Sequence, residues 1–483
     1  MNRPAGPPVA SPARRPAGPE HPPMQHDLSS AAATTPARRR IVATGHESTG
    51  RASSRTRSAP ASGALLIAAQ AFAALALAAL SLTAGCGAEP HDPRDEPPGP
   101  DPGADWVWDL PAGIPAPHVP PDNPMSAASV ELGRFLFHDP ILSRNRDFSC
   151  ASCHIQALAF TDGLPRAIGS TGEEHPRGSM SLTNVAYNAT LNWANPHFVL
   201  LEQQASVPIF GDDPIELGLR SHEELTERLL ADDAYVQRFV AAFGSELGAS
   251  RADGNTRDER GGSAEPVAPE DVVTVRNVTR ALAAFQRTMT SFDAPWDRYG
   301  RGDRGAISDA AKRGAELFFS ERLECFHCHG GFNLSSSVDH DGLIAAEVSF
   351  HNNGLYNVDG AGAYPARNPG LAELTDDPAD HGLFRAPTLR NIAVTAPYMH
   401  DGSLETLEDV IRHYARGGTL TADGPNAGDG ALSPLRSPFV VGFIISDDEV
   451  ADLIAFLEAL TDESFLTRED LSSPFDDPPT APR

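Results

Sequence analysis

The chain has 483 residues, with 65 acidic side chains against 38 lysines and arginines, and its formal net charge is −27 at pH 7. This excess of negative charge argues against nucleic-acid binding and against electrostatic binding to an anionic membrane surface. Four of the five cysteines fall in two short motifs described below, so no pair remains for a structural disulfide.

The first 86 residues are predicted to be a leader rather than part of the fold. A polar stretch rich in Pro, Ala and Arg precedes an apolar run at about residues 65–82, and small residues then lead to Cys86. A basic flank, an apolar core and small residues before a cysteine are typical of a lipoprotein signal. We therefore expect export to the periplasm and a lipid anchor on Cys86; an uncleaved N-terminal anchor would give the same compartment.

Residues 87–122 are rich in Pro, Asp and Gly and lack apolar periodicity, as expected of a disordered tether. Residues 244–266 are polar and Gly-rich, which predicts a surface insertion. Amphipathic patterns predict helices over residues 129–137, 221–243, 269–298, 308–319 and 446–460. Capping boxes are expected where a serine precedes a glutamate by three residues, at Ser221 with Glu224 and at Ser446 with Glu449.

Two copies of a C-x-x-C-H motif carry the chemistry of the chain. The first comprises Cys150, Cys153 and His154, and the second comprises Cys325, Cys328 and His329. This is the attachment pattern of a c-type haem, in which two thiols bond covalently to the porphyrin and the histidine ligates the iron. A structural zinc site or a redox dithiol is the alternative. Two matches in a chain expected to be exported favour two covalently bound haems c.

Each motif follows a predicted helix, and strand-like alternation is scarce. The sequence therefore predicts a mainly α protein with two cytochrome c-like helical domains, each around one covalently bound haem. We expect the N-terminal domain over residues 123–300, the C-terminal domain over residues 301–465 and a tail over residues 466–483.

Several further segments, in fixed order, resemble the bacterial di-haem cytochrome c peroxidases and the related MauG enzymes. Residues 384–391 and 395–402 match the signature of their C-terminal half, and residues 201–205 and 214–217 match that of their N-terminal half. The likeness covers roughly residues 125–462. It implies a peroxide-reactive haem in the N-terminal domain and an electron-transfer haem in the C-terminal domain.

The resemblance also implies a ligand opposite His329. In the peroxidases, a methionine follows the histidine of a His-Asp-Gly motif by fourteen residues; here that histidine is His400 and the fourteenth residue is Tyr414. The MauG enzymes are similar in using tyrosine at this position. A phenolate stabilises highly oxidised iron, whereas a thioether favours the ferrous state. We favour Tyr414 over the alternative ligand Met399; an ordinary buried helix tyrosine is the other interpretation.

At the N-terminal haem, family peroxidases often place a removable histidine sixteen residues beyond the haem-binding histidine, where this chain has Ser170. The resemblance thus implies an open or water-bound iron, unless a loop shift brings His175 over it. Glu216 occupies the position of the catalytic glutamate and Gln204 that of a distal glutamine that orients peroxide. A solvated loop carboxylate is the alternative for Glu216.

Two further features follow from the resemblance, and a third follows from arginines that flank the motifs. Trp193 matches a tryptophan that relays charge between the haems, although packing would also explain a buried tryptophan. A calcium ion is expected between the haems on the backbone carbonyls of Thr395 and Pro397, although Gly178 replaces the asparagine that completes this site. The haem propionates would pair with Arg144, Arg385 and Arg390. The alternative for these arginines is ordinary solvated surface charge.

Together these features predict a MauG-like enzyme that reacts with hydrogen peroxide at the N-terminal haem and shares oxidising equivalents with the C-terminal haem. Its electrons would come from a small redox protein or from a protein substrate. An ordinary cytochrome c peroxidase that removes peroxide is the nearest alternative. A non-catalytic di-haem electron-transfer protein and a haem-based sensor are alternatives of other classes.

Overall fold

The structure, a computed structural model, describes residues 106–253 and 267–475, which all belong to one compact unit of the chain. The predicted leader with Cys86 and residues 87–105 of the predicted tether lie outside the described residues. The expectation of a mainly helical fold is confirmed: the strands of the described residues form two antiparallel pairs, β1 (Phe350–His351) with β2 (Phe384–Arg385) and β3 (Leu420–Thr421) with β4 (Gly428–Asp429).

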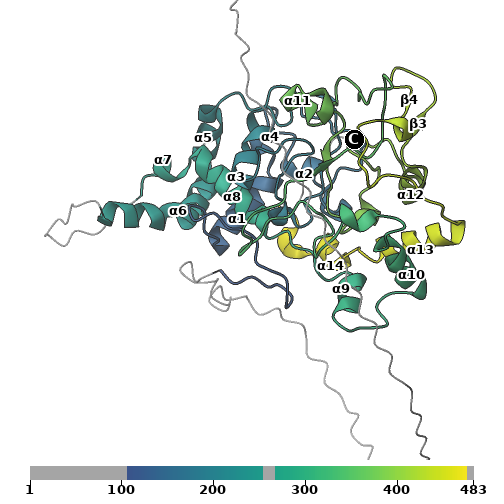
Figure 1. The fold of residues 1–483 in the computed structure, drawn as a ribbon. Helices are drawn as coiled ribbons and strands as arrows, with labels where there is room; N and C mark the ends of the chain where they lie inside the picture. The colour runs from purple at the N-terminus through teal and green to yellow at the C-terminus, as the bar shows by residue number, and fades with distance from the viewer. Residues whose placement is uncertain (1–105, 254–266, 476–483) are drawn as a thin grey trace, which may run out of the picture. The chain divides into compact units, whose positions relative to one another are not determined.

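The helices gather around two hydrophobic cores (Figure 1). The helices of the first lobe are α1 (Ala127–His138), α2 (Cys150–Cys153), α3 (Leu201–Gln204), α4 (Ser206–Phe210), α5 (His222–Leu230), α6 (Asp233–Asp253), α7 (Pro269–Val272), α8 (Val275–Arg287) and α14 (Glu463–Thr467). The helices of the second lobe are α9 (Pro295–Gly300), α10 (Asp309–Phe318), α12 (Leu407–Arg416) and α13 (Asp447–Glu458), while α11 (Ala372–Thr375) has no residue in either core.

One packing arrangement occurs in both lobes. In the first lobe α1 packs on α8, and in the second α10 packs on α13, where the two helices lie side by side in Figure 1. At each crossing a glycine brings two backbones together: a Cβ on Gly133 would overlap the carbonyl of Ala281, and a Cβ on Gly314 would overlap that of Asp452. A phenylalanine four residues after each carbonyl faces the same glycine. This repeat agrees with the expected recurrence of a helix before each C-x-x-C-H motif.

The segment predicted as one helix over residues 221–243 is two helices. Helix α5 ends at Leu230, and α6 then begins at Asp233 and continues to Asp253, inside the expected insertion of residues 244–266. Ser221 caps α5 as predicted, because its hydroxyl accepts from the backbone N–H of Glu224. The Glu224 carboxylate bonds to the N–H of Arg220, so the predicted reciprocal bond of the capping box is replaced.

The prediction of one helix over residues 269–298 is also wrong, since α7, α8 and α9 occupy this range. The Thr274 side chain accepts from the N–H of Asn277 and so starts α8 after a break. Pro295 then starts α9, which packs in the second lobe: the N–H of Trp296 donates to Ala459 O at 3.0 Å, and its ring meets Phe456 edge-on. The helices expected near residues 129–137, 308–319 and 446–460 are confirmed as α1, α10 and α13, and α13 carries its predicted capping box.

Both ends of the described chain contact the body of the protein. Part of the predicted tether is held at Pro115, whose carbonyl accepts from the Tyr187 hydroxyl at 2.8 Å, and at Ala116, whose carbonyl accepts from the N–H of Asp341. Phe465 and Leu471 are buried in the first core, so the chain returns to the first lobe after α13. Residues 106–122 and 466–475 therefore differ from the expected free tether and tail, while the division into two domains stays a prediction.

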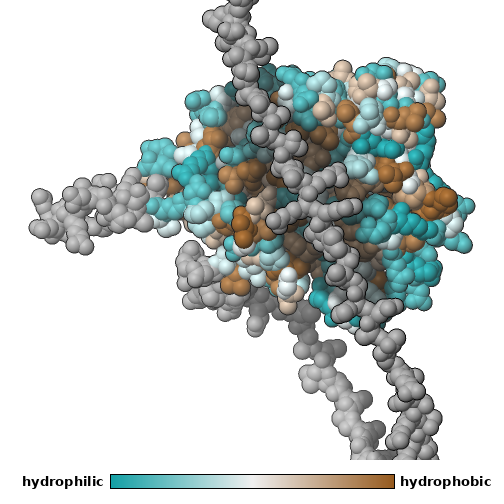
Figure 2. Space-filling view, viewed as in Figure 1, coloured by the Kyte–Doolittle hydropathy of each residue, from teal (hydrophilic) through white to brown (hydrophobic). Residues whose placement is uncertain are grey.

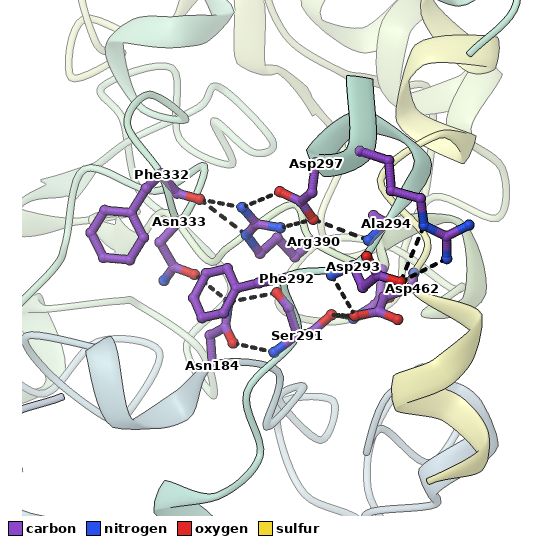
Figure 3. Close-up of polar contacts among 12 residues, drawn as sticks. Asn184, Ser291, Phe292, Asp293, Ala294, Asp297, Phe332, Asn333, Arg390 and Asp462 are labelled. Carbon is purple, nitrogen blue, oxygen red and sulfur yellow. Dashed lines mark hydrogen bonds and ion pairs between the residues drawn. The ribbon is translucent and has the colours of Figure 1, made fainter. Parts of the chain in front are cut away.

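A buried polar network joins the two lobes (Figure 3). Asn184 accepts from the N–H of Ser291 at 2.7 Å and donates to Asn333 Oδ1 at 3.0 Å. The Ser291 hydroxyl donates to the Asp462 carboxylate, and the N–H of Asp462 donates to Asn391. These bonds connect segments that follow both C-x-x-C-H motifs, and hydrogen bonds between buried polar groups favour one arrangement of the two lobes.

Hydrophilic residues dominate the face shown in Figure 2, and hydrophobic residues form separate groups among them. None of the helices in residues 106–253 and 267–475 has the length and apolar content needed to cross a membrane.

Candidate active site

The first motif forms the short helix α2 and the turn that follows it. Ala159 and Phe160 have left-handed backbone conformations, with φ of +50° and +61°, and this turn directs the carbonyl of Phe160 at the His154 ring. His154 Nδ1 lies 2.8 Å from that carbonyl. A carbonyl can only accept, so Nδ1 carries the proton and Nε2 is free to bind a metal. Burial lowers the pKa of His154, which keeps the imidazole neutral as iron ligation requires.

The second motif repeats this arrangement. Cys325–His327 form a 3₁₀ turn, and His329 Nδ1 lies 3.1 Å from the carbonyl of Pro387. Burial lowers the pKa of His329 to about 4 and raises that of the Cys325 thiol to about 12. All four cysteines of the described residues are outside disulfides. Each motif thus presents two free thiols and a neutral, oriented imidazole.

The second motif opens onto a cavity of about 260 Å³ with a mainly apolar lining. Cys325, Cys328 and His329 lie on its wall, and so do Arg385 and His400. Arg385 Nε and Nη1 and His400 Nε2 are buried without a hydrogen-bond partner. A haem has an apolar macrocycle and two anionic propionates, so an apolar cavity with unpaired cationic and polar groups fits it. Buried polar groups without a partner are otherwise costly.

Tyr414 and Met399 both line this cavity. Tyr414 is on α12, which begins with a capping box between Thr406 and Asp409, and burial raises the pKa of its phenol. Asn353 lines the same cavity, and its Nδ2 donates to Met399 Sδ at 3.2 Å. The choice of Tyr414 as the iron ligand therefore stays a prediction.

Glu216 lies beside the first motif, where its charge acts on the thiols of Cys150 and Cys153. Its side chain is half-buried, and burial raises the pKa of its carboxyl to about 7. Ser170 holds the loop that carries it, because the Ser170 N–H donates to Glu216 O at 2.7 Å and its hydroxyl donates to Leu217 O at 3.0 Å. Ser170, at the position where family peroxidases often have a removable histidine, thus positions the Glu216 loop.

His175 lies close to Ile215 of the same loop, and its Nε2 is buried without a hydrogen-bond partner. Gln204 is the last residue of α3 and is half-buried. The roles proposed for His175 and Gln204 stay predictions.

Trp193 connects segments around the two motifs. Its Nε1–H donates to Gly178 O at 2.9 Å, and its carbonyl accepts from the N–H of Arg385 at 2.8 Å. Trp193 lines the second-motif cavity, and so do Thr395 and Pro397, the expected calcium ligands. A relay between haems and a calcium ion at these carbonyls stay predictions.

The three arginines expected near propionates differ. Arg385 is the one with unpaired buried nitrogens facing the cavity. Arg390 is instead engaged in a buried ion pair with Asp297, at 2.9 and 3.0 Å, and also donates to Phe332 O, as Figure 3 shows. Arg144 is exposed. The expectation for Arg390 is therefore wrong, because its guanidinium is already neutralised.

Sequence patterns missed Asn353 and His351, which line the same cavity. Burial lowers the pKa of His351, and its Nε2 has no partner. The one local signal is a run of polar residues before Gly354 in an irregular segment, and such runs are common in loops.

The profile of a family described as di-haem cytochrome c peroxidase matches residues 127–305. The methylamine utilization protein MauG of Methylorubrum extorquens is 34% identical over 347 residues, which cover 72% of this chain and 82% of that protein. The chain belongs to the di-haem cytochrome c peroxidase and MauG family.

Other members of the family are similarly related. A cytochrome-c peroxidase, IdrP1, of a Pseudomonas species is 32% identical over 75% of this chain and 88% of its own length. A crystal structure of a MauG-like protein associated with microbial copper homeostasis has a TM-score of 0.70 and 46% identity, and covers 76% of this chain and 99% of that chain. As a member of the di-haem peroxidase family, the protein is a peroxidase-type oxidoreductase with haem cofactors.

Proposed function

We propose that the protein is a MauG-like di-haem peroxidase whose two haems c have different tasks. Cys150, Cys153 and His154 would hold the haem at which peroxide reacts, and Cys325, Cys328, His329 and Tyr414 would hold the haem that stores an oxidising equivalent. The observation that carries the proposal is the half-buried Glu216 carboxyl, with a pKa raised to about 7, beside the first motif.

When bound, the first haem supplies the iron at which the O–O bond of hydrogen peroxide is reduced. Glu216 takes a proton from one peroxide oxygen and delivers it to the leaving oxygen. A carboxyl with a pKa near the working pH can both accept and return a proton. Gln204 orients the peroxide through its amide, and Ser170 keeps the Glu216 loop in position.

The surroundings of the second haem favour storage of charge. Tyr414 lines the cavity, and burial raises the pKa of its phenol, which disfavours the phenolate. A bound metal ion would stabilise the phenolate by its positive charge, so Tyr414 would be anionic only as a metal ligand. Trp193 relays charge between the haems. It lies on the cavity wall, and its Nε1–H donates a hydrogen bond to Gly178 O. The backbone carbonyls of Thr395 and Pro397 would hold a calcium ion.

The compartment and the electron source complete the proposal. We infer a periplasmic protein tethered to a membrane through lipidated Cys86, in agreement with the leader-like composition of the first 86 residues. Electrons come from a small redox protein or from a protein substrate oxidised at the surface.

Electron paramagnetic resonance of the resting ferric holoprotein tests the proposal. We expect one high-spin haem, which is open to peroxide, and one low-spin haem without the signature of histidine–methionine ligation. A histidine–methionine signal from the second haem would favour the ordinary cytochrome c peroxidase, with Met399 as ligand. Two low-spin haems that do not react with peroxide would favour a non-catalytic electron-transfer protein.

A further inference from the structure

A chain of contacts leads from the second-motif cavity to a half-buried tyrosine. Asn353, which lines the cavity together with Tyr414, accepts from the Tyr364 hydroxyl at 3.4 Å. The Tyr364 ring lies 6.0 Å from that of Phe384 on the cavity wall and 5.5 Å from that of Tyr356, measured between ring centroids. Asn353 and these rings thus lead from the cavity wall at Tyr414 to Tyr364 and Tyr356, and we call the three tyrosines the tyrosine path.

Tyr356 differs from Tyr364 in the group that accepts its hydrogen bond. The Tyr356 hydroxyl donates to the Asp401 carboxylate at 2.7 Å, whereas the acceptors near the Tyr364 hydroxyl are the side-chain amide oxygens of Asn352 at 3.1 Å and Asn353 at 3.4 Å. A phenol that loses an electron becomes a strong acid, and a carboxylate at hydrogen-bond distance can take its proton, whereas an amide oxygen is too weak a base. An oxidising equivalent on the tyrosine path is therefore most stable at Tyr356.

Asp401 is suited to this exchange by its position. Its other carboxylate oxygen accepts from the N–H of Ser403 at 3.2 Å, which fixes its orientation. The side chain of Asp401 is partly exposed, at 12%. The pair thus lies between the buried cavity and solvent.

We propose that Tyr356 is a redox-active tyrosine that passes oxidising equivalents from the second haem to an electron donor at the surface, with Asp401 as the acceptor of its proton. This inference rests on the proposed peroxidase function, which supplies hydrogen peroxide as the oxidant. Tyr356 gives one electron to the peroxide-oxidised haem pair and its phenolic proton to Asp401. One electron from the donor and the proton from Asp401 then restore the phenol, and two such cycles reduce one peroxide to two waters with two solvent protons.

Tyr235 provides a matched comparison. Among the described residues it is the other phenol that donates to a carboxylate, Asp139, and its distance is also 2.7 Å. Tyr235 is buried in the first core, whereas Tyr364 and Tyr356 belong to a separate hydrophobic cluster with Phe384. The same local chemistry is therefore present off the tyrosine path.

The test uses the full-length protein with both haems attached. Each variant is mixed with one equivalent of hydrogen peroxide without a reductant, frozen, and measured by electron paramagnetic resonance, with ring-deuterated tyrosine to assign the radical. We expect wild type and Tyr235→Phe to give a tyrosyl signal. In Tyr356→Phe and Asp401→Asn the intensity of this signal is expected to be lower by a factor of about ten or more. Both substitutions keep the shape of the side chain, so the fold is expected to persist.

Stopped-flow absorbance of the haems separates this inference from the proposed function. We expect all four proteins to show the same rate of haem oxidation by peroxide, within about twofold. If the haems of wild type react but no tyrosyl signal forms, or if Tyr356→Phe keeps the signal, the inference is overturned and the proposed function stands. If the haems of wild type do not react with peroxide, both are overturned.

Discussion

Glu216 owes its proposed role to the loop that carries it. A carboxyl on an exposed loop would ionise near its ordinary pKa, but burial beside the first motif raises the pKa of Glu216 to about 7. The two hydrogen bonds from Ser170 to Glu216 O and Leu217 O fix the loop without touching the carboxyl. The carboxyl can therefore exchange its proton with a substrate rather than with a structural partner.

This pKa predicts the pH dependence of the peroxide reaction. Below about pH 7 the Glu216 carboxyl is protonated and cannot take a proton, so the rate is expected to rise with pH through a midpoint near 7. Glu216→Gln should remove this rise and lower the rate about 10²–10³-fold, as expected for loss of a general base. Stopped-flow absorbance of the haems at varied pH measures both effects.

Glu174→Gln is the control, since Glu174 is an exposed carboxylate that pairs with Arg166. It should leave the rate and its pH profile unchanged. A Glu216→Gln variant with the pH profile of wild type would contradict the proposed role.

The ligand of the second haem is also decided by single residues. If Tyr414 binds the iron, Tyr414→Met replaces an anionic oxygen by a neutral thioether, which should raise the reduction potential of that haem. Spectroelectrochemical titration of the holoprotein measures the change. Tyr398→Phe is the control, because Tyr398 lines the same cavity but its hydroxyl donates to Ile392 O. An unchanged potential in Tyr414→Met would favour Met399 as ligand.

At the scale of elements, each lobe depends on one close helix crossing. Helix α1 meets α8 at Gly133, and α10 meets α13 at Gly314, where a side chain larger than hydrogen has no room. Phe285 and Phe456, four residues after the contacted carbonyls, fill the space beside these glycines and are fully buried. The crossings position the helices that precede each C-x-x-C-H motif.

Gly314→Ala is expected to destabilise the protein. Its methyl group would overlap the carbonyl of Asp452, and forcing the helices apart should lower the free energy of unfolding by about 1–3 kcal/mol. Chemical denaturation of the holoprotein measures this loss. Gly300→Ala, where the added carbon meets open space, should leave stability within about 0.5 kcal/mol of wild type. Equal stability of Gly314→Ala and Gly300→Ala would show that the crossing is not tightly packed.

At the scale of the whole molecule, the network in Figure 3 holds the two lobes together. Its centre is Asp462, whose carboxylate accepts hydrogen bonds from Ser291, Asp293, Ser464 and Phe465. Burial alone would raise the pKa of Asp462, but these bonds outweigh it and the pKa is lowered. The ionised carboxylate is therefore favoured in the folded protein.

Asp462→Asn tests the contribution of this charge. A group whose pKa is lowered by folding stabilises the protein above its ordinary pKa and loses this effect as the pH falls through its folded value. We expect Asp462→Asn to cost about 1.5–3 kcal/mol at pH 7, since hydrogen bonds to a charged group are lost. The difference from wild type should decrease as the pH falls below 3.8, the ordinary pKa of an aspartate side chain.

Thermal denaturation of both holoproteins over this pH range gives the measurement. Asp309→Asn is the control, because Asp309 is an exposed carboxylate paired with Lys312 and such pairs contribute little. A cost for Asp462→Asn no larger than for Asp309→Asn would contradict a central role of the network.

Much of the helical framework could be predicted from the sequence, and the errors have local causes. Helices α1, α10 and α13 combine an apolar periodicity with a capping serine, and the sequence predicts them near their observed bounds. The chain breaks after Leu230 and at Thr274 do not interrupt the apolar periodicity of residues 221–243 or of residues 269–298. The reason is that the apolar residues on both sides of each break face the same core. Periodicity reports which face is buried, but does not report a change in helix direction.

The sequence by itself determined the attachment chemistry of this protein. The thiols and imidazole of each motif are neighbours along the chain, so their spacing suffices to predict a covalent haem. Only the tertiary structure decided what surrounds each motif: the engagement of Arg390 by Asp297, the unpaired nitrogens of Arg385, and the contact of Tyr356 with Asp401. These groups are distant in sequence, and their proximity depends on how the two lobes pack.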